Sequence, residues 1–245
     1  MKKTRISTTA LDFDRPLVTV DVVIFSVLDD TLKVLMSRRP ARVDERAEPF
    51  PGRWALPGGF VDVAQDCTLL DCAMRKLQAK TGVTAPYLEQ LGSWGSADRD
   101  PRGWSTTHVY FALVHLPPAA WASDTTGLNE SRWTAVDEAL REPLAFDHNG
   151  LLAAAIARLR NKVEYTSLPA FFLPEPFTLP QLQYTYEVVL GRPVDKSAFR
   201  KRMLDAGFLE EAGMQGGATG RSAVAYRVKD RAQAVAFPRT FKVSE

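Results

Sequence analysis

Residues 57–83 read PGGFVDVAQDCTLLDCAMRKLQAKTGV, a pattern of a tight turn, a loop and a helix. The dipeptide Gly58-Gly59 after a proline indicates a sharp backbone turn. A helix is predicted over residues 69–80, because the apolar residues recur every four positions and form one stripe. Thr68 is placed to cap the first turn of this helix, and Gly82 is placed to end it. The stretch therefore predicts a glycine turn followed by an amphipathic helix.

The segments on either side of this stretch predict a layered domain of strands and helices. Residues 17–25 are β-branched and partly alternating, which indicates a strand. Asp29-Asp30 then makes a turn into a returning strand over residues 32–36. The other predicted elements are two strands and a helix, at residues 87–93, 106–116 and 150–160. This interleaving is typical of an α/β (α+β) fold.

The pattern changes after residue 165. Residues 165–180 contain four prolines among apolar residues and predict a packed connector. A capping box at residues 178–181 opens a helix that runs to Leu190, and Asp195 caps a second helix over residues 196–206. Two short strands, at residues 208–210 and 224–228, flank a glycine-rich segment. Helix, turn, helix and a hairpin with a glycine-rich tip is the order of a winged helix-turn-helix domain.

Length and charge divide the chain in a similar way. The 245 residues predict two domains, which we place at residues 1–160 and 161–245. Apolar residues make up 45% and charged residues 24%, which excludes wholesale disorder. The net charge of +2 is uneven: residues 161–245 carry 12 basic and 9 acidic side chains, and residues 1–160 carry 19 and 20. The basic second part predicts contact with a polyanion.

Cysteine content and hydropathy indicate the compartment. Two cysteines in a chain of this length exclude a disulfide-stapled secreted domain. The basic residues near the N-terminus are not followed by the apolar run of a signal peptide. The longest apolar stretch, around residues 22–28, is far too short to span a membrane. We therefore expect a cytoplasmic protein without a membrane partner.

The turn and helix of residues 57–83 resemble the Nudix hydrolase family. Its motif reads G-x5-E-x7-R-E-U-x-E-E-x-G-U, where U is apolar, and Gly59, Arg75, Gly82 and Val83 match it. The resemblance covers roughly residues 16–160 on ordinary domain size. It implies a mixed sheet between helices and cleavage of nucleoside diphosphates linked to another group. In the family, three glutamates share one helix face and hold Mg²⁺ against a pyrophosphate.

The glutamates of this motif are absent here. The three helix glutamates are replaced by Lys76, Ala79 and Lys80. The loop before the helix is two residues longer than in the motif, so the first glutamate falls at Gln65 or at Cys67, depending on the end from which it is counted. Ammonium groups repel a divalent cation, and Mg²⁺ needs at least one or two carboxylates. We expect neither a metal site nor metal-dependent hydrolysis, and we assign no catalytic residue.

Lys76 and Lys80 lie one helical turn apart and place positive charge where the motif would place a metal. We predict that they hold a pyrophosphate without cleaving it. The alternative is an ordinary solvated helix face. Asp62, Asp66 and Asp71 are possible substitute metal ligands, but their spacing does not converge on one helix face.

Further residues are predicted to bind a nucleotide effector. Arginine offers forked donors to phosphate, and tryptophan offers a stacking face for a base or ribose. The loop DRDPRGW at residues 98–104 resembles loops of Nudix proteins that handle ADP-ribose. Surface solubility is the ordinary alternative for each arginine. Besides the two lysines, the predicted effector-binding residues are Arg38, Arg53, Gly59, Arg99, Arg102 and Trp104. The three histidines lack metal-ligand spacing, and we expect structural roles for them.

The helix over residues 196–206 divides into an apolar and a basic side. Its predicted apolar stripe consists of Ala198, Phe199, Met203 and Leu204, and Arg202 lies at the edge of the basic side. A recognition helix needs this division, because one face packs on its own domain and the other reaches phosphates and bases. The predicted DNA-binding residues are Lys196, Ser197, Arg200 and Lys201, with Arg221 entering the minor groove from the wing tip. The alternative is a surface helix that is basic by chance.

A Nudix-like part without its carboxylates, followed by a winged helix, resembles the Nudix-related transcriptional regulators of NAD metabolism, the NrtR family. Residues 75–83 and 195–201 are similar to that family's box and recognition helix. The resemblance implies a homodimeric bacterial repressor of genes for NAD synthesis or salvage. It implies a double-stranded DNA operator with half-sites about one turn, or a multiple of it, apart. ADP-ribose or a related NAD metabolite is the implied effector, and no cofactor is implied.

Two other functions stay open at this point. One is an active Nudix ADP-ribose pyrophosphatase with an accessory C-terminal domain. The other is a nucleotide-binding module whose basic tail contacts RNA or a protein.

Overall fold

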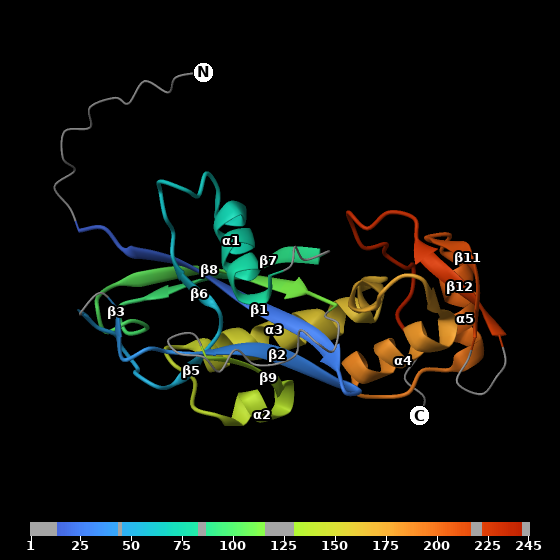
Figure 1. The fold of residues 1–245 in the computed structure, drawn as a ribbon, viewed down its shortest axis with the longest axis horizontal. Helices are drawn as coiled ribbons and strands as arrows, with labels where there is room; N and C mark the ends of the chain where they lie inside the picture. Colours follow the sequence, from blue (N-terminus) through green and yellow to red (C-terminus); the bar gives the residue numbers. More distant parts are fainter. Residues whose placement is uncertain (1–13, 44–45, 83–86, 116–129, 217–221, 242–245) are drawn as a thin grey trace, which may run out of the picture.

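The computed structural model describes residues 14–43, 46–82, 87–115, 130–216 and 222–241. Its first part is a mixed sheet with helices on both faces, and its second part is a smaller helical unit with a three-stranded sheet (Figure 1). The seven strands of the large sheet are β1 (Leu17–Leu28), β2 (Thr31–Arg38), β5 (Trp54–Ala55), β6 (Gly58–Phe60), β7 (Tyr87–Ser96), β8 (Ser105–Leu113) and β9 (Ser131–Ala135). A separate short hairpin is formed by β3 (Arg42–Val43) and β4 (Arg46–Ala47).

The central strand β1 organises the first part. It pairs in parallel with β8 and antiparallel with β2, so the sheet is mixed, as predicted. Successive side chains of a strand point to opposite faces. Val22 and Ile24 accordingly pack into one apolar cluster, and Val23 and Phe25 pack into the other. This double burial explains why β1 is apolar at consecutive positions.

Each of these clusters is covered by a helix. Helix α1 (Leu69–Thr81) buries Cys72, Ala73 and Leu77 against the first cluster. Helix α3 (His148–Val163) covers the opposite face, and the short α2 (Val136–Arg141) packs beside it. The predicted helix over residues 69–80 is confirmed, with the Thr68 cap and the left-handed Gly82. The predicted helix over 150–160 begins two residues earlier and ends three later, and β9 and α2 were not predicted.

The second part confirms the predicted winged-helix order. Helices α4 (Leu179–Leu190) and α5 (Lys196–Asp205) precede the strands β11 (Leu209–Gly216) and β12 (Ser222–Val228). The connector forms two elements that proline content did not reveal: a 3-10 helix, η2 (Leu168–Phe172), and β10 (Phe177–Thr178), which pairs with β12. Strand β11 is longer than the predicted 208–210. The wing tip, including Arg221, lies outside the described residues.

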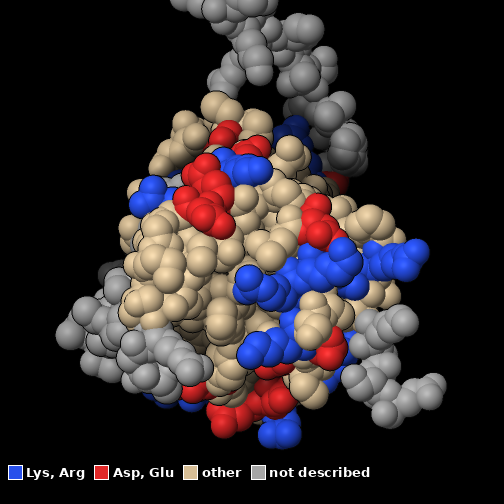
Figure 2. Space-filling view, turned by 90° about the vertical axis from the view of Figure 1, so that its right-hand side faces the viewer, with Lys and Arg blue, Asp and Glu red and all other residues tan. Residues whose placement is uncertain are grey.

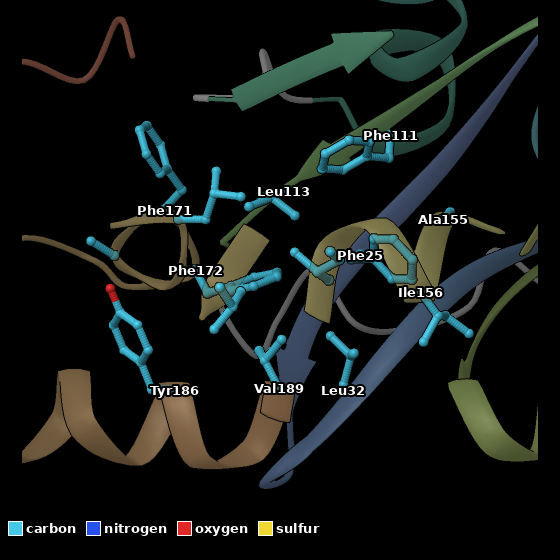
Figure 3. Packing of buried hydrophobic residues seen from close by; sticks show 14 of the residues in the cluster. Phe25, Leu32, Phe111, Leu113, Ala155, Ile156, Phe171, Phe172, Tyr186 and Val189 are labelled. Carbon is cyan, nitrogen blue, oxygen red and sulfur yellow. The ribbon is translucent and has the colours of Figure 1, made fainter. Parts of the chain in front are cut away.

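One apolar cluster joins the two parts. It contains Phe25 and Phe111 of the sheet, Ile156 of α3, Phe172 of η2 and Tyr186 of α4, all of which are labelled in Figure 3. Helix α4 packs against η2, α3 and the neighbouring strands β1 and β2. Residue 160, where the sequence places the domain boundary, lies within α3. None of the helices in the described ranges is long and apolar enough to cross a membrane.

We expect that Tyr186→Phe destabilises the protein through the joint between its two parts. The Tyr186 hydroxyl donates a 2.7 Å hydrogen bond to the Thr166 carbonyl in a buried position. Removing the donor leaves this carbonyl without its partner, at a cost of about 1–3 kcal/mol in the free energy of unfolding. Urea denaturation measures the change. Tyr165→Phe, the same substitution on a partly exposed ring, serves as control, and equal free energies for both variants would refute this account.

Candidate functional sites

The turn at Gly58 and Gly59 packs directly against the central strand β1. Gly58 is opposite Asp21 of β1, and a Cβ atom on Gly58 would lie 1.9 Å from the Asp21 Oδ1 atom and 2.8 Å from the Val20 carbonyl oxygen. No side chain fits at such a distance. Gly59 follows with a φ of 138°, a conformation that favours glycine. Both glycines are therefore required where β6 joins the sheet.

Lys76 reaches from α1 to this turn. A Cβ atom on Gly59 would lie 3.0 Å from the Lys76 Nζ atom, so the ammonium group rests against the glycine. Burial lowers the pKa of Lys76, and the neighbouring positive charge of Arg75 lowers it further. The group thus lies at the surface of the turn, partly stripped of water.

A cleft of about 680 Å³ opens over the turn and this lysine. It is lined by Arg39, Pro40, Val43, Glu48, Gly58, Gly59, Phe60, Val61, Asp62, Val63, Arg75, Lys76 and Arg102. Four of these side chains are basic and two are acidic. Gly59, Lys76 and Arg102 are thus the predicted effector-binding residues that this cleft brings together. Its cationic wall suits a phosphorylated ligand.

The loop from β6 to α1 is fixed by an internal ion pair. Arg75 donates hydrogen bonds of 2.7 and 2.6 Å to the two carboxylate oxygens of Asp66, whose side chain is only 2% exposed. The hydrogen bonds from Arg75 hold the pKa of Asp66 well below its ordinary value. Arg75, the arginine of the motif, is thereby paired with Asp66. Asp66 belongs to the loop before α1, which is two residues longer than in the motif.

The remaining carboxylates near the turn do not form a metal site. Asp71 completes the capping box with Thr68, and Asp62 accepts hydrogen bonds from Ala64 and Gln65. Among the described residues, no group of three His, Cys, Asp or Glu side chains could hold a metal ion. Lysine and alanine replace the glutamates of the helix. The residues present therefore do not fit the Mg²⁺ that the Nudix motif implies.

A buried polar network lies below the turn. Asp21 accepts a 2.7 Å hydrogen bond from Thr107, and the Nη2 atom of Arg99 lies 3.7 Å from its Oδ2 atom. Arg99 is 7% exposed and donates to both carboxylate oxygens of Asp147. It lines a small inner hollow beside the cleft. The guanidinium is thus largely committed to internal partners, which the sequence did not reveal; its predicted role in effector binding stays a prediction.

His148 closes the same hollow at the first residue of α3. Its Nδ1 atom accepts a 2.9 Å hydrogen bond from the Leu56 amide. Burial lowers the pKa of this histidine, and the nearby Asp21 carboxylate opposes the shift. His148 is therefore neutral at physiological pH and has a structural partner, as expected.

The other predicted effector-binding residues do not line this cleft. Trp104 is 51% exposed and lines a second cleft of about 690 Å³, which shares Arg102 with the first. Lys80 lies one turn beyond Lys76 and is not among the lining residues of the first cleft. Arg38 and Arg53 do not line it either. Arg38 instead donates a 2.9 Å hydrogen bond to Glu130, and Arg53 lies over the ring of Phe50.

Arg39 lines the cleft but is not among the effector-binding residues predicted from the sequence. It lines both the cleft and the inner hollow, and burial lowers its pKa. It donates to Glu48 and stands over the Phe146 ring at 4.7 Å. Because side chains alternate along a strand, only one of Arg38 and Arg39 at the end of β2 can point toward the turn. This alternation was the available signal.

A second candidate site is the outer face of α5. Phe199 and Met203 are buried, whereas Lys196, Ser197, Arg200 and Lys201 are all exposed, as the predicted division requires. The predicted apolar stripe is wrong at two positions, because Ala198 and Leu204 are exposed. Figure 2 shows lysine and arginine side chains gathered on this end of the molecule. Arg221 lies outside the described residues.

Comparison with known proteins matches both parts of the chain to described families. The sequence profile of the NUDIX domain matches residues 17–155, and that of the NrtR DNA-binding winged helix domain matches residues 169–228. An Acinetobacter baylyi protein named "ADPR responsive transcriptional repressor NtrR" is 45% identical over 228 residues, covering 93% of this chain and 88% of that protein. The chain belongs to the NrtR family.

Solved NrtR structures resemble both parts of the chain. Shewanella oneidensis NrtR, complexed with a 27mer DNA, matches with a TM-score of 0.81 and 39% identity, over 92% of this chain and 99% of that one. The NUDIX domain of Shewanella NrtR, cocrystallised with ADP ribose, matches with a TM-score of 0.52 and 40% identity, over 60% of this chain and 90% of that one. The predicted fold, a Nudix-type mixed sheet followed by an NrtR winged helix, is thus confirmed.

The Asp66–Arg75 pair predicts a pH dependence of stability. A carboxyl group whose pKa is lowered by folding stabilises the folded state above its ordinary pKa of about 4, and this contribution is lost as the pH falls toward the lowered value. We therefore expect Asp66→Asn to lower the midpoint temperature of thermal unfolding at pH 7. The difference in midpoint between this variant and the unmodified protein should narrow below about pH 4.

The matched control is Asp98→Asn, which removes an exposed carboxylate. We expect no comparable gap for this variant at any pH. A gap for Asp66→Asn that stays constant down to pH of about 2 would contradict the assigned ion pair.

Proposed function

We propose that this NrtR-family chain is a ligand-sensing transcriptional repressor of genes for NAD biosynthesis or salvage. In this proposal the first part binds ADP-ribose or a related NAD metabolite without hydrolysing it, and the winged helix binds double-stranded operator DNA. The repressor works as a homodimer in the cytoplasm. The relative named as an ADPR-responsive repressor and the two Shewanella NrtR complexes support both partners.

The observation that carries the sensing role is the position of Lys76. Its ammonium group rests on Gly59 at the mouth of the cleft, where the Nudix motif would supply a carboxylate. A fixed cation stabilises a bound pyrophosphate but cannot hold the Mg²⁺ that polarises it for attack. The charge reversal therefore favours binding over cleavage. The alternative, an active ADP-ribose pyrophosphatase, would need metal-binding carboxylates at these positions.

The remaining cleft residues extend this binding role. Arg102 borders both clefts, and Arg39 stands on the wall of the first. A dinucleotide-like ligand has two ends, and Trp104 in the second cleft offers an exposed ring for stacking. We propose that the pyrophosphate meets Lys76 and Arg102 while one end of the ligand lies toward Trp104. Lys80, Arg38, Arg53 and Arg99 stay secondary candidates.

On the DNA side, α5 presents its exposed basic face at one end of the molecule. A homodimer would carry two such helices to a two-fold operator. The effector can weaken DNA binding only if it binds the DNA-competent conformation less tightly than another one. The apolar cluster shared by the sheet, α3, η2 and α4 is the physical link through which this preference would act.

We expect the unmodified protein to bind ADP-ribose in isothermal titration calorimetry with the same affinity in Mg²⁺ and in EDTA. Lys76→Ala should weaken binding roughly ten- to hundred-fold, because a hydrogen bond to a charged group contributes about 1.5–3 kcal/mol. Lys33→Ala removes an ammonium group on the distant β1–β2 hairpin and should change little. Mg²⁺-dependent turnover at about 1 s⁻¹ or more would instead support the pyrophosphatase.

We expect Arg200→Ala to weaken binding to duplex DNA by about 1–3 kcal/mol, because an exposed arginine on a recognition helix contacts bases or phosphates. Gel shifts at stated salt concentration measure this effect. The control, Arg141→Ala, removes an equally charged exposed side chain at the end of α2. Equal affinities of the two variants would refute the helix assignment, and preference for single-stranded RNA would favour a different partner.

A further inference from the structure

The chain continues past the winged helix as a C-terminal tail, residues 229–241, which lies beyond the residues matched by the winged-helix profile. The tail returns to the connector between the two parts. The Ser167 amide donates to the Val235 carbonyl, the Val235 amide donates to the Ser167 hydroxyl, and the Phe237 amide donates to the Tyr165 carbonyl at 2.7 Å. These hydrogen bonds fix the path of the tail.

Aromatic rings anchor the end of the tail to the DNA-binding unit. Phe237 packs against Phe208, and Phe241 stacks on Phe199 of α5 at a centroid distance of 6.0 Å. Arg202 of α5 lies over the Phe241 ring at 3.8 Å and donates a 2.7 Å hydrogen bond to the Thr240 carbonyl. Arg202, at the edge of the basic side, is thus turned toward the tail. Residues 238–240 are held between two anchors.

This arrangement places Arg239 beside the exposed face of α5. A groove of about 620 Å³ separates the helix from the tail, with Ala198 and Lys201 on one side and Arg239 on the other. The Arg239 side chain is exposed, and it makes no ion pair within the described ranges. The acidic residue in the groove, Asp205, is already paired with Lys201 at 2.6 Å.

We infer that Arg239 binds a phosphate of the DNA backbone beside the groove that receives α5. This inference rests on the proposed DNA-binding function and extends its surface to the tail. A helix about 10–12 Å wide fills the major groove, which is about 12 Å wide, so a segment flanking the helix meets the phosphates of the groove edge. Arginine recognises phosphate through its forked donors.

The anchoring of the tail makes this contact favourable. Pro238 has a fixed φ, and Thr240 is tied to Arg202, so little backbone freedom remains to be lost on binding. The contact reads no base and adds affinity to any duplex. Its partner is therefore double-stranded DNA irrespective of sequence.

The test uses the full chain and a fluorescein-labelled 30-base-pair duplex of mixed sequence. Fluorescence anisotropy gives the affinity between about 50 and 200 mM KCl, a range over which electrostatic binding changes strongly. Arg239→Ala should weaken binding roughly fivefold or more at 100 mM KCl, and should lower the slope of log affinity against log salt by about 0.9 for each lost phosphate contact. Arg239→Lys retains the charge and should restore the slope.

The controls separate this inference from the function on which it rests. Arg141→Ala should leave both affinity and slope unchanged, and Arg200→Ala should weaken binding. No binding by the unmodified protein would refute the DNA-binding function itself. Binding that Arg200→Ala weakens, with Arg239→Ala equal to Arg141→Ala, would refute only the tail contact. A weaker affinity with an unchanged slope, or a slope that lysine does not restore, would also overturn it.

Discussion

The molecule depends on one constraint, the burial of β1 on both of its faces. One face packs under α1 and the glycine turn, and the other packs in the apolar cluster with α3, η2 and α4. The turn that shapes the cleft and the helix that opens the DNA-binding unit are therefore seated on the same strand. Gly58 approaches Asp21 of this strand so closely that no side chain fits at this position. The cleft in the first part and the winged helix in the second part therefore both rest on β1.

The cleft keeps the backbone scaffold of the Nudix motif but not its glutamates. The helix, its caps and the glycine turn of the Nudix motif are all retained. What changes is the sign of the charge at the turn, where Lys76 replaces a carboxylate. Arg75, the arginine of the motif, donates its hydrogen bonds to Asp66 and not to a glutamate of the motif. The carboxylate set of the motif is therefore missing from the described residues at this turn, and the Lys76 ammonium group lies against Gly59 instead.

Periodicity and capping rules predicted the features that depend on residues close together in the sequence. The helix of residues 69–81 and its caps, the order of the winged helix and the exposure of Lys196, Arg200 and Lys201 follow from periodicity and capping. Placement that depends on distant neighbours was beyond those rules. Arg99 is buried because it pairs with Asp147, which is 48 positions away in the sequence. Arg202 is turned away from the basic side because it donates a hydrogen bond to Thr240 in the C-terminal tail. Leu204 is exposed because the domain covers only a narrow strip of α5. Side-chain alternation allows only one of Arg38 and Arg39 to face the turn, and the structure shows that Arg39 does.

Helix α3 extends from the hollow beside the cleft to the apolar cluster that joins the two parts. Its first residue, His148, borders the hollow below the turn, and its last turns lie in the apolar cluster with α4. Sixteen residues of helix make a rod about 24 Å long. A tilt of about 5° at one end displaces the other by about 2 Å, the scale of a helix shift in a switching protein. A rod of this length ties the hollow at its first turn to the apolar cluster at its last turns.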